Sequence, residues 1–225
     1  MSGRLPLDKI TVIELGHSVA APFAGQILGD LGADVIKVEK VDGDDARKWA
    51  PPYWGGISSM FSAFNRNKRS VVVDLRDQAK KARLKQLIVD RADVVVQNLR
   101  PGAALAAGLD GDALCSLKSS LIYCNISAFG NVGPLSERPG YDPLMQAFAG
   151  LMSVTGEPGQ NPVRVGTSII DMAAGMWAVI GFCFSRRQTS RPSMPGISTS
   201  RSTMSHCPRA QMSSAAGPFI AVSTS

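Results

Sequence analysis

The 225-residue sequence has few of the side chains that build metal sites, disulfide frameworks and membrane spans. It contains only two His, and its four Cys include no Cys-x-x-Cys pair. Such sparse, widely spaced cysteines predict reduced thiols in a cytoplasmic protein and no metal site. Polar residues interrupt every apolar run well short of the roughly 20 residues that a membrane-spanning helix needs. The first residues have no signal-peptide pattern, so we expect neither a membrane association nor an organellar address.

The sequence also lacks a basic surface, although its net charge is +6. Residues 183–225 hold five Arg and no Lys, Asp or Glu. Because the whole chain has 24 basic and 18 acidic residues, residues 1–182 keep 19 basic against 18 acidic residues, a balance of +1. A nearly neutral body predicts no nucleic-acid partner, since nothing in it would follow a phosphate backbone.

What the sequence does contain is an alternation of two hydrophobic periods along residues 1–182. Runs rich in β-branched residues, typical of buried strands, occupy 10–16, 34–40, 69–75, 93–99 and 120–130. Helical spacing is seen at 22–33 and 77–92, and a shorter helix is indicated at 112–117. This alternation predicts an α/β fold, a Rossmann-like doubly wound and mostly parallel sheet that binds ligands beyond the carboxyl ends of its strands.

The end of the chain differs in kind. Residues 183–225 contain 11 Ser and 4 Thr among 43 residues, without helical or strand periodicity. That composition cannot bury a core. We therefore predict a domain at 1–182 and a disordered tail at 183–225. Because the change falls inside an apparent helix, an out-of-frame or mis-spliced end is favoured over a regulatory tail.

A nicotinamide-dependent oxidoreductase is the first function that a βαβ start indicates, with Glu39 in the place of the ribose-binding acid. The turn after the first strand, however, reads GHSVAAPFAG and lacks the G-x-G-x-x-G pattern. Without those glycines the backbone does not offer the usual approach to a pyrophosphate, which weakens this interpretation.

One carboxylate stands inside a small, apolar stretch, GTSIIDMAAGMW at 166–177. A charge taken out of water costs several kcal/mol unless it is paired, so Asp171 needs an explanation. In one interpretation Thr167 or Ser168 caps a helix, and Asp171 faces solvent in its first turn beside the positive end of the dipole. In the other, Asp171 is a catalytic group. This segment alone favours the first.

Several segments together resemble the family III CoA-transferases, also called the CaiB/BaiF family. They are ELGHSVAAPFAGQILGDLGADVIKVEK, FNRNKRSVVVDL, ADVVVQNLRPG, SAFGNVGPLSERPGYDPLMQA and GTSIIDMAAGMWAVIGF, in family order over about residues 5–182. The resemblance implies an enzyme that moves CoA from an acyl-CoA donor to a carboxylic acid, with Asp171 as nucleophile. The expected intermediates are an aspartyl anhydride and an aspartyl-CoA thioester, whose oxyanions require nearby donors such as backbone N–H groups.

The resemblance also implies residues that contact coenzyme A, which is a substrate here and not a tightly bound cofactor. These are Val19, Ala20, Lys40, Val73, Asp74, Leu75, Arg76, Asn98, Leu99 and Arg100. Lys40, Arg76 and Arg100 are the expected phosphate partners. Near the active site a family Lys is replaced by Pro139, and Arg138 beside it is the substitute we expect to line the site together with Tyr141.

Tyr141 distinguishes two activities within the family. Related acyl-CoA racemases read GHD where this chain reads GYD, and a phenol with a pKa near 10 is a poor base at neutral pH. His17 is interpreted as a local hydrogen-bonding residue and does not restore that function. A transferase is therefore preferred over a racemase.

The match ends near Phe182, whereas family members are considerably longer and form interlocked homodimers. We expect this chain to lack the second domain and to be unable to close that ring. Two hypotheses follow: a transferase acting on a succinyl-CoA-type donor and a short dicarboxylate acceptor, or an inactive fragment that binds CoA or a partner.

Overall fold

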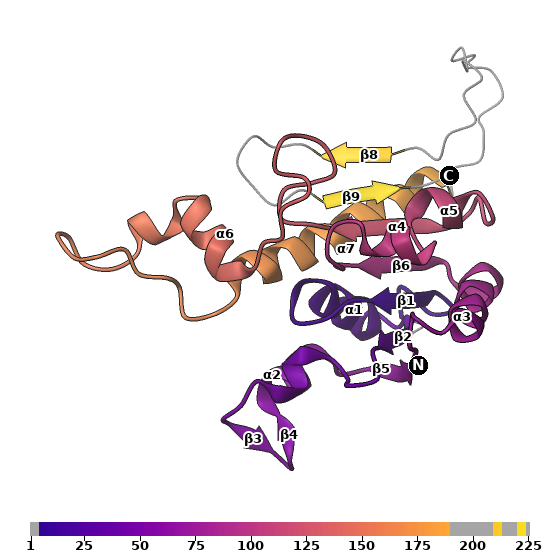
Figure 1. The fold of residues 1–225 in the computed structure, drawn as a ribbon, viewed down its shortest axis with the longest axis horizontal. Helices are drawn as coiled ribbons and strands as arrows, with labels where there is room; N and C mark the ends of the chain where they lie inside the picture. Colours follow the sequence, from indigo (N-terminus) through magenta and orange to yellow (C-terminus); the bar gives the residue numbers. More distant parts are fainter. Residues whose placement is uncertain (1–4, 190–208, 213–219, 224–225) are drawn as a thin grey trace.

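The computed structural model describes residues 5–189, 209–212 and 220–223. Its centre is a seven-stranded sheet in the order β5-β2-β1-β6-β7-β9-β8 (Figure 1). Five strands are parallel, namely β1 (Thr11–Leu15), β2 (Asp34–Glu39), β5 (Lys68–Val72), β6 (Val94–Gln97) and β7 (Ile122–Ile126). β9 (Ile220–Ser223) runs antiparallel to β7, and β8 (Arg209–Met212) runs antiparallel to β9. The predicted doubly wound, mostly parallel sheet is confirmed.

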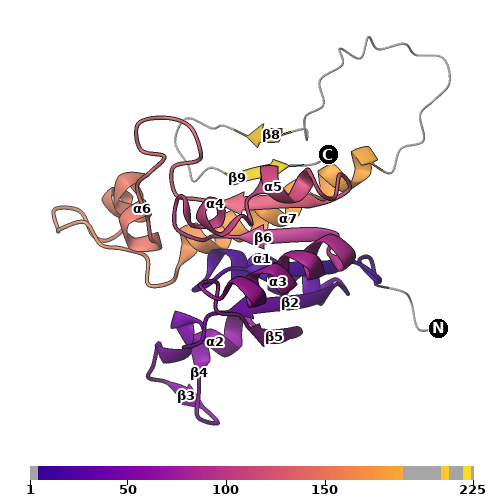
Figure 2. The same cartoon turned by 45° about the vertical axis from the view of Figure 1, so that its right-hand side comes forward.

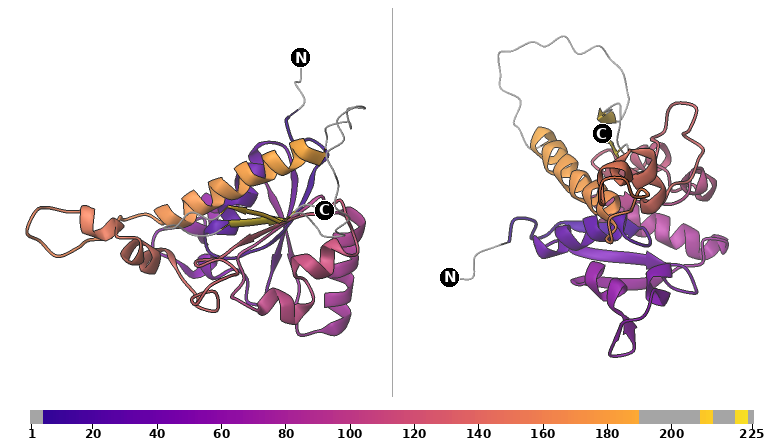
Figure 3. Two further views of the ribbon diagram at one scale, coloured as in Figure 1. Left: turned by 90° about the horizontal axis from the view of Figure 1, so that it is seen from above. Right: turned by 90° about the vertical axis from the view of Figure 1, so that its left-hand side faces the viewer.

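Helices cover both faces of this sheet (Figure 3). α1 (Ala20–Asp30) and α7 (Ile169–Thr189) lie against each other on one face. α3 (Gln78–Arg91) and α5 (Gly111–Cys115) cover the other, with the short α4 (Ala103–Ala107) beside them. The two helices of the first face approach closely at Gly175, where an added Cβ would lie 2.7 Å from the carbonyl oxygen of Ala20. Only a glycine permits this crossing.

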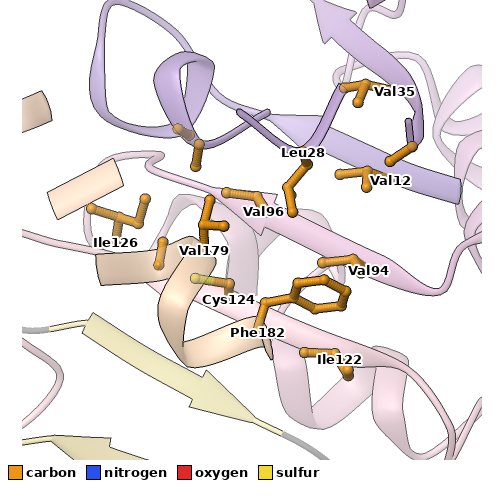
Figure 4. Close-up of a cluster of buried hydrophobic side chains, with 14 of the residues drawn as sticks. Val12, Leu28, Val35, Val94, Val96, Ile122, Cys124, Ile126, Val179 and Phe182 are labelled. Carbon is orange, nitrogen blue, oxygen red and sulfur yellow. The ribbon is translucent and has the colours of Figure 1, made fainter. Parts of the chain in front are cut away.

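Each face of the sheet has its own apolar core because strand residues alternate between the two faces. Figure 4 shows the core beneath α1 and α7, where Phe182 and Val179 of α7 pack against the labelled strand residues Val94, Val96 and Ile122. The second core joins Ile13 and Val95 to the helices α3 and α5. Together the two cores fix the strand ends on which the site is built.

Several elements were not expected from the sequence. They are the 3-10 turns η1 (Asp45–Lys48) and η2 (Leu151–Val154), the hairpin of β3 (Tyr53–Trp54) and β4 (Ile57–Ser58), and the helices α2 (Ser59–Phe64) and α6 (Asp142–Phe148). The β3–β4 hairpin and α6 project away from the sheet at two different places (Figures 1 and 2). Short elements of this kind carry too few residues for a period to be read.

α7 continues past residue 182, so the predicted boundary between domain and tail falls inside a helix. Its packed face runs from Ala174 and Ala178 through Phe182 to Ser185, which is 4% exposed. Two strands, β8 and β9, also lie within the predicted tail, while residues 190–208, 213–219 and 224–225 lie outside the described residues.

By length and composition alone, α7 could also cross a membrane, since its window Ile169–Arg186 is sufficiently apolar. Such a test is passed equally by a core helix of a soluble protein. One side of α7 packs against α1 and the sheet, and 33% of this window is buried.

Candidate active site

The site begins where the order of the parallel strands reverses, between β1 and β6. Ligands of doubly wound sheets bind beyond the strand carboxyl ends at this point. The turns that follow the two strands are joined by a reciprocal pair of hydrogen bonds. The N–H of His17 donates to Oδ1 of Asn98, and Nδ2 of Asn98 donates to the carbonyl of His17, both at 3.0 Å.

Buried charges hold the turn after β1 in place. Nζ of Lys37 lies 2.8 Å from Oε1 of Glu14 and 2.8 Å from Oδ2 of Asp44, and it donates to the carbonyl of Gly16 at 2.9 Å. The N–H of Ser18 donates to the other oxygen of Asp44 at 2.9 Å, which supports the left-handed backbone of Ser18 (φ 68°). Burial opposes the charge of Lys37, but the two carboxylates outweigh it and raise the pKa of the ammonium group. The turn is therefore fixed by ion pairs that water does not reach.

Asp171 lies in a small cavity of about 80 Å³ beside this turn. The cavity brings together residues from the turns after β1 and β6, the end of β7 and the loop before α6, with Asp171 supplied by the start of α7. Seven of the predicted residues line it: Ala20, Asn98, Leu99, Arg100, Arg138, Tyr141 and Asp171. Four of the five segments quoted for the family resemblance, although distant in sequence, thus meet at this cavity.

The electrostatics of Asp171 are those of a carboxylate removed from water. Burial, followed by the negative charge of Asp142, raises its pKa from 3.8 to about 7. Within the described part of the chain, no group donates a hydrogen bond to the Asp171 carboxylate that would offset this burial. A carboxylate whose pKa is raised is more basic, and hence a stronger nucleophile when ionised, than one held by several donors.

The capping role that the sequence favoured for Thr167 or Ser168 belongs to another residue. Oδ1 of Asp142 accepts hydrogen bonds from the N–H groups of Ile170 at 2.8 Å and Asp171 at 3.3 Å. Asp171 is in the first turn of α7, as expected, but its side chain is largely buried and does not face solvent freely.

A larger cavity, of about 520 Å³, adjoins the first. It collects the predicted CoA contacts Lys40, Val73, Asp74, Leu75, Arg76, Leu99 and Arg100. His17, Leu99, Arg100 and Tyr141 line both cavities, so the two are adjacent. Most of the residues expected to contact the substrate therefore lie around two neighbouring cavities, and their roles stay a prediction.

The predicted phosphate partners differ in how they are held. Lys40 forms an ion pair with Asp45, and both side chains are about half exposed. Nε of Arg76 donates to Oδ1 of Asp74 at 2.9 Å and Nη2 donates to Oδ2 at 3.0 Å, in a two-point pair. A phosphate would have to compete with these carboxylates for Lys40 and Arg76.

One predicted contact lies elsewhere, one residue of the site was missed, and His17 makes the local hydrogen bond expected of it. Val19 is 1% exposed, lines neither cavity and belongs to the apolar interior. Asp142, in the quoted GYD segment, was passed over although an acid at a helix start is a recognisable signal. His17 faces both cavities, its Nδ1 lies 3.0 Å from Oγ of Ser18, and burial lowers its pKa, which favours a neutral ring.

The chain is similar to proteins of known kind. The sequence pattern of CoA-transferase family III matches residues 7–208. A succinate–glutarate CoA-transferase of Agrobacterium fabrum is 42% identical over 181 residues, which are 77% of this chain and 45% of that protein. The human succinyl-CoA:glutarate CoA-transferase is 40% identical over 79% of this chain and 41% of its own length. A crystal structure of a CAIB/BAIF family protein from Brucella suis is 40% identical with a TM-score of 0.79, over 84% of this chain and 52% of that chain.

Proposed function

The chain belongs to CoA-transferase family III, and on that premise we propose that it supplies the nucleophile of a CoA transfer between two carboxylic acids. The observation that carries this proposal is the position of Asp171. Its largely buried carboxylate, whose pKa is raised to about 7, lies in a small cavity next to a larger one lined by Lys40, Arg76 and Arg100.

Each of the two cavities would hold a different part of the acyl-CoA substrate. The larger one has the volume and the cations for the nucleotide part of coenzyme A. The pantetheine arm would then pass Leu99 and Tyr141, which line both cavities, and bring the thioester to Asp171. Such placement converts an encounter between two molecules into an attack within one complex.

The proposed chemistry consists of four acyl transfers. An oxygen of Asp171 attacks the thioester carbonyl carbon, the carbon–sulfur bond breaks, and the CoA thiolate leaves behind a mixed anhydride. The thiolate then attacks the aspartyl carbonyl carbon, which releases the donor acid and forms an aspartyl-CoA thioester. The acceptor carboxylate attacks this thioester, and the thiolate released finally attacks the acceptor acyl carbon. Asp171 ends as a free carboxylate, and no atom is gained or lost.

Each step passes through an oxyanion that needs hydrogen-bond donors. The N–H groups of Ile170 and Asp171 cannot serve, because Oδ1 of Asp142 accepts from both. Ala20 lines the same cavity, and α1 begins there without a side-chain cap. The first N–H groups of α1 are therefore the donors that we assign to the oxyanions.

The substrates that we propose are a succinyl-CoA-type donor and a short dicarboxylate acceptor. Similarity to proteins named for succinate, succinyl-CoA and glutarate supports this choice. Arg138, an exposed cation lining the Asp171 cavity, is a suitable partner for a second carboxylate. Because the chain spans less than half the length of these two relatives, the activity of the whole protein belongs to the proposal as well.

The test is to detect the aspartyl thioester directly. The purified chain is mixed with succinyl-CoA and reduced with borohydride, which converts an aspartyl thioester into homoserine. Peptide mass spectrometry should place homoserine at position 171, and the isosteric variant Asp171→Asn should yield none. Binding of succinyl-CoA by a folded chain without any modification would refute the chemistry and leave a CoA-binding protein. Deuterium exchange at the substrate α-carbon would instead identify a racemase.

A further inference from the structure

Asp142 contacts the start of the nucleophile helix from a different element. It opens α6, is 3% exposed, and reaches across to α7. Its Oδ1 accepts the N–H groups of Ile170 and Asp171, which are two of the donors that have no partner within α7. A buried carboxylate that accepts backbone N–H groups at a helix start is held firmly, because the hydrogen bonds are charge-assisted and aligned with the dipole.

Gln146 holds Asp142 in that position. Its side chain is fully buried, and Nε2 donates to Oδ2 of Asp142 and to the carbonyl of Thr167 at 3.3 Å. Oε1 of Gln146 accepts the N–H of Val165 at 2.8 Å. One glutamine thus ties the acid of α6 to the segment that leads into α7. The pair of Asp142 and Gln146 fixes both the direction of that segment and the first turn of the helix.

A first-turn acid ordinarily satisfies its charge with the free N–H groups of its own helix. For Asp171 these hydrogen bonds are not available, because Asp142 already accepts the N–H groups of Ile170 and Asp171. Among the residues that the structure describes, none donates to the Asp171 carboxylate, which lines the cavity instead. Because Asp142 accepts the N–H groups at the helix start, the Asp171 carboxylate stays available to attack a substrate, as a nucleophile must be.

We propose that Asp142 is the positioning residue of Asp171: by capping α7 it keeps the Asp171 carboxylate free, directed into the cavity and close to a second negative charge. This inference rests on the proposed function, in which Asp171 is the nucleophile. Asp142 touches neither the substrate nor the reacting atoms.

Asp142 is one of several charged or titratable groups that face Asp171. The others come from the turn after β1, the turn after β6 and the loop before α6: His17, Arg100, Arg138 and Tyr141. Only Asp142 both hydrogen-bonds to the backbone of residue 171 and, after burial, raises the pKa of its carboxyl group. Removing its charge should therefore change the titration of Asp171 as well as its reactivity.

The experiment compares Asp142→Asn with a matched control, Asp77→Asn. Asn keeps an oxygen for the two N–H groups but removes the charge. Asp77 caps α3 in the same manner, accepting the N–H groups of Ala79 and Lys80, and lines neither cavity. Carboxyl-detected ¹³C NMR of the full chain follows the titration midpoint of Asp171, and borohydride trapping after succinyl-CoA follows its reactivity from about pH 5 to about pH 9.

We expect Asp142→Asn to move the midpoint of Asp171 downward by at least about half a pH unit. The trapping rate at high pH should fall at least about threefold, because a less basic carboxylate is a weaker nucleophile. Asp77→Asn should change neither quantity. A variant that loses thermal stability while both quantities stay at the wild-type value would overturn the inference, since that is what a purely structural cap would do.

Gln146→Met supplies a second measurement if Asp142→Asn does not fold. This substitution preserves the apolar volume and leaves the charge of Asp142 in place. The midpoint of Asp171 should stay, while the trapping rate falls, because the charge remains but its brace is lost. An unchanged rate would contradict the inference. If the wild-type chain forms no adduct with succinyl-CoA, the proposed function is refuted. The NMR titration needs no turnover, so it still tests the effect of Asp142 on Asp171 in that case.

Discussion

Replacing Asp171 by Asn should stabilise the fold, and should do so increasingly as the pH rises. Burial raises the pKa of Asp171 from 3.8 to about 7, so the folded state holds the proton to a higher pH than the unfolded state does. A group of this kind favours folding below its unfolded pKa, and that contribution is lost as the pH rises through the folded pKa. The ionised Asp171 carboxylate therefore lowers the stability of the wild type at high pH, whereas the neutral Asn does not.

The size of the effect follows from the two pKa values. At about 1.4 kcal/mol for each tenfold change in the proton equilibrium, the difference corresponds to an upper limit of about 4 kcal/mol. Because the cavity admits water, which screens the charge, we expect about 2 kcal/mol at pH 8. Well below pH 3.8 both states of the wild type are largely protonated, and the two proteins should differ little. The gain should develop between about pH 4 and about pH 7 and then level off.

Urea unfolding monitored by circular dichroism at several pH values measures this difference. The variant should unfold at a higher urea concentration than the wild type at pH 8, with the same slope, which would mean that only stability has changed. Asp77→Asn is the control for the loss of an acid at a helix start and should show no such gain. A variant no more stable than the wild type at pH 8, or a gain independent of pH, would refute the electrostatic account of Asp171.

Three further predictions concern the frame that positions the site. Lys37→Met should destabilise the chain by about 3 to 5 kcal/mol in urea unfolding, because it removes the cation that pairs with the buried carboxylate of Asp44 and leaves Glu14 with Lys68 alone; a loss under 1 kcal/mol would contradict this. Gly175→Leu should cost at least about 1 to 3 kcal/mol, since a side chain there meets the backbone of α1, and an unchanged melting temperature would show that the helices can separate. Tyr123→Phe should cost about 1 to 2 kcal/mol in thermal unfolding, because the carbonyl of Leu109 loses the buried hydroxyl that donates to it at 2.9 Å, whereas a neutral result would mean that water replaces the hydroxyl.

The regular part of the fold was predictable because its signals are local. Alternation of β-branched runs and amphipathic segments placed the strands β1, β2, β5, β6 and β7 and the long helices near their observed positions. The family resemblance then supplied a set of expected site residues, and all but Val19 line one or both of two adjacent cavities. Strand ends gather ligands at a switch point in any doubly wound sheet, so this much follows from topology.

The buried ion pairs were not predicted, although a signal for them exists. Glu14 and Lys37 stand in neighbouring parallel strands at the same register, each inside an otherwise apolar run. An acid buried in one strand needs a cation within reach, and the paired position of the neighbouring strand is a place where one can stand. That inference requires the register of the sheet, which the hydrophobic pattern of one strand at a time does not supply.

The choice between the two interpretations of Asp171 likewise depended on a contact between distant segments, which one segment alone does not reveal. From its own segment a first-turn acid is a cap, because the helix start offers free N–H groups and a positive dipole. The structure gives that role to Asp142, which lies 29 residues earlier in the sequence and reaches the helix from α6. Asp142 already accepts the N–H groups of Ile170 and Asp171, so the Asp171 side chain is not needed to cap them. Since burying it still costs free energy, the redundancy of Asp171 is the physical reason to assign it a chemical role.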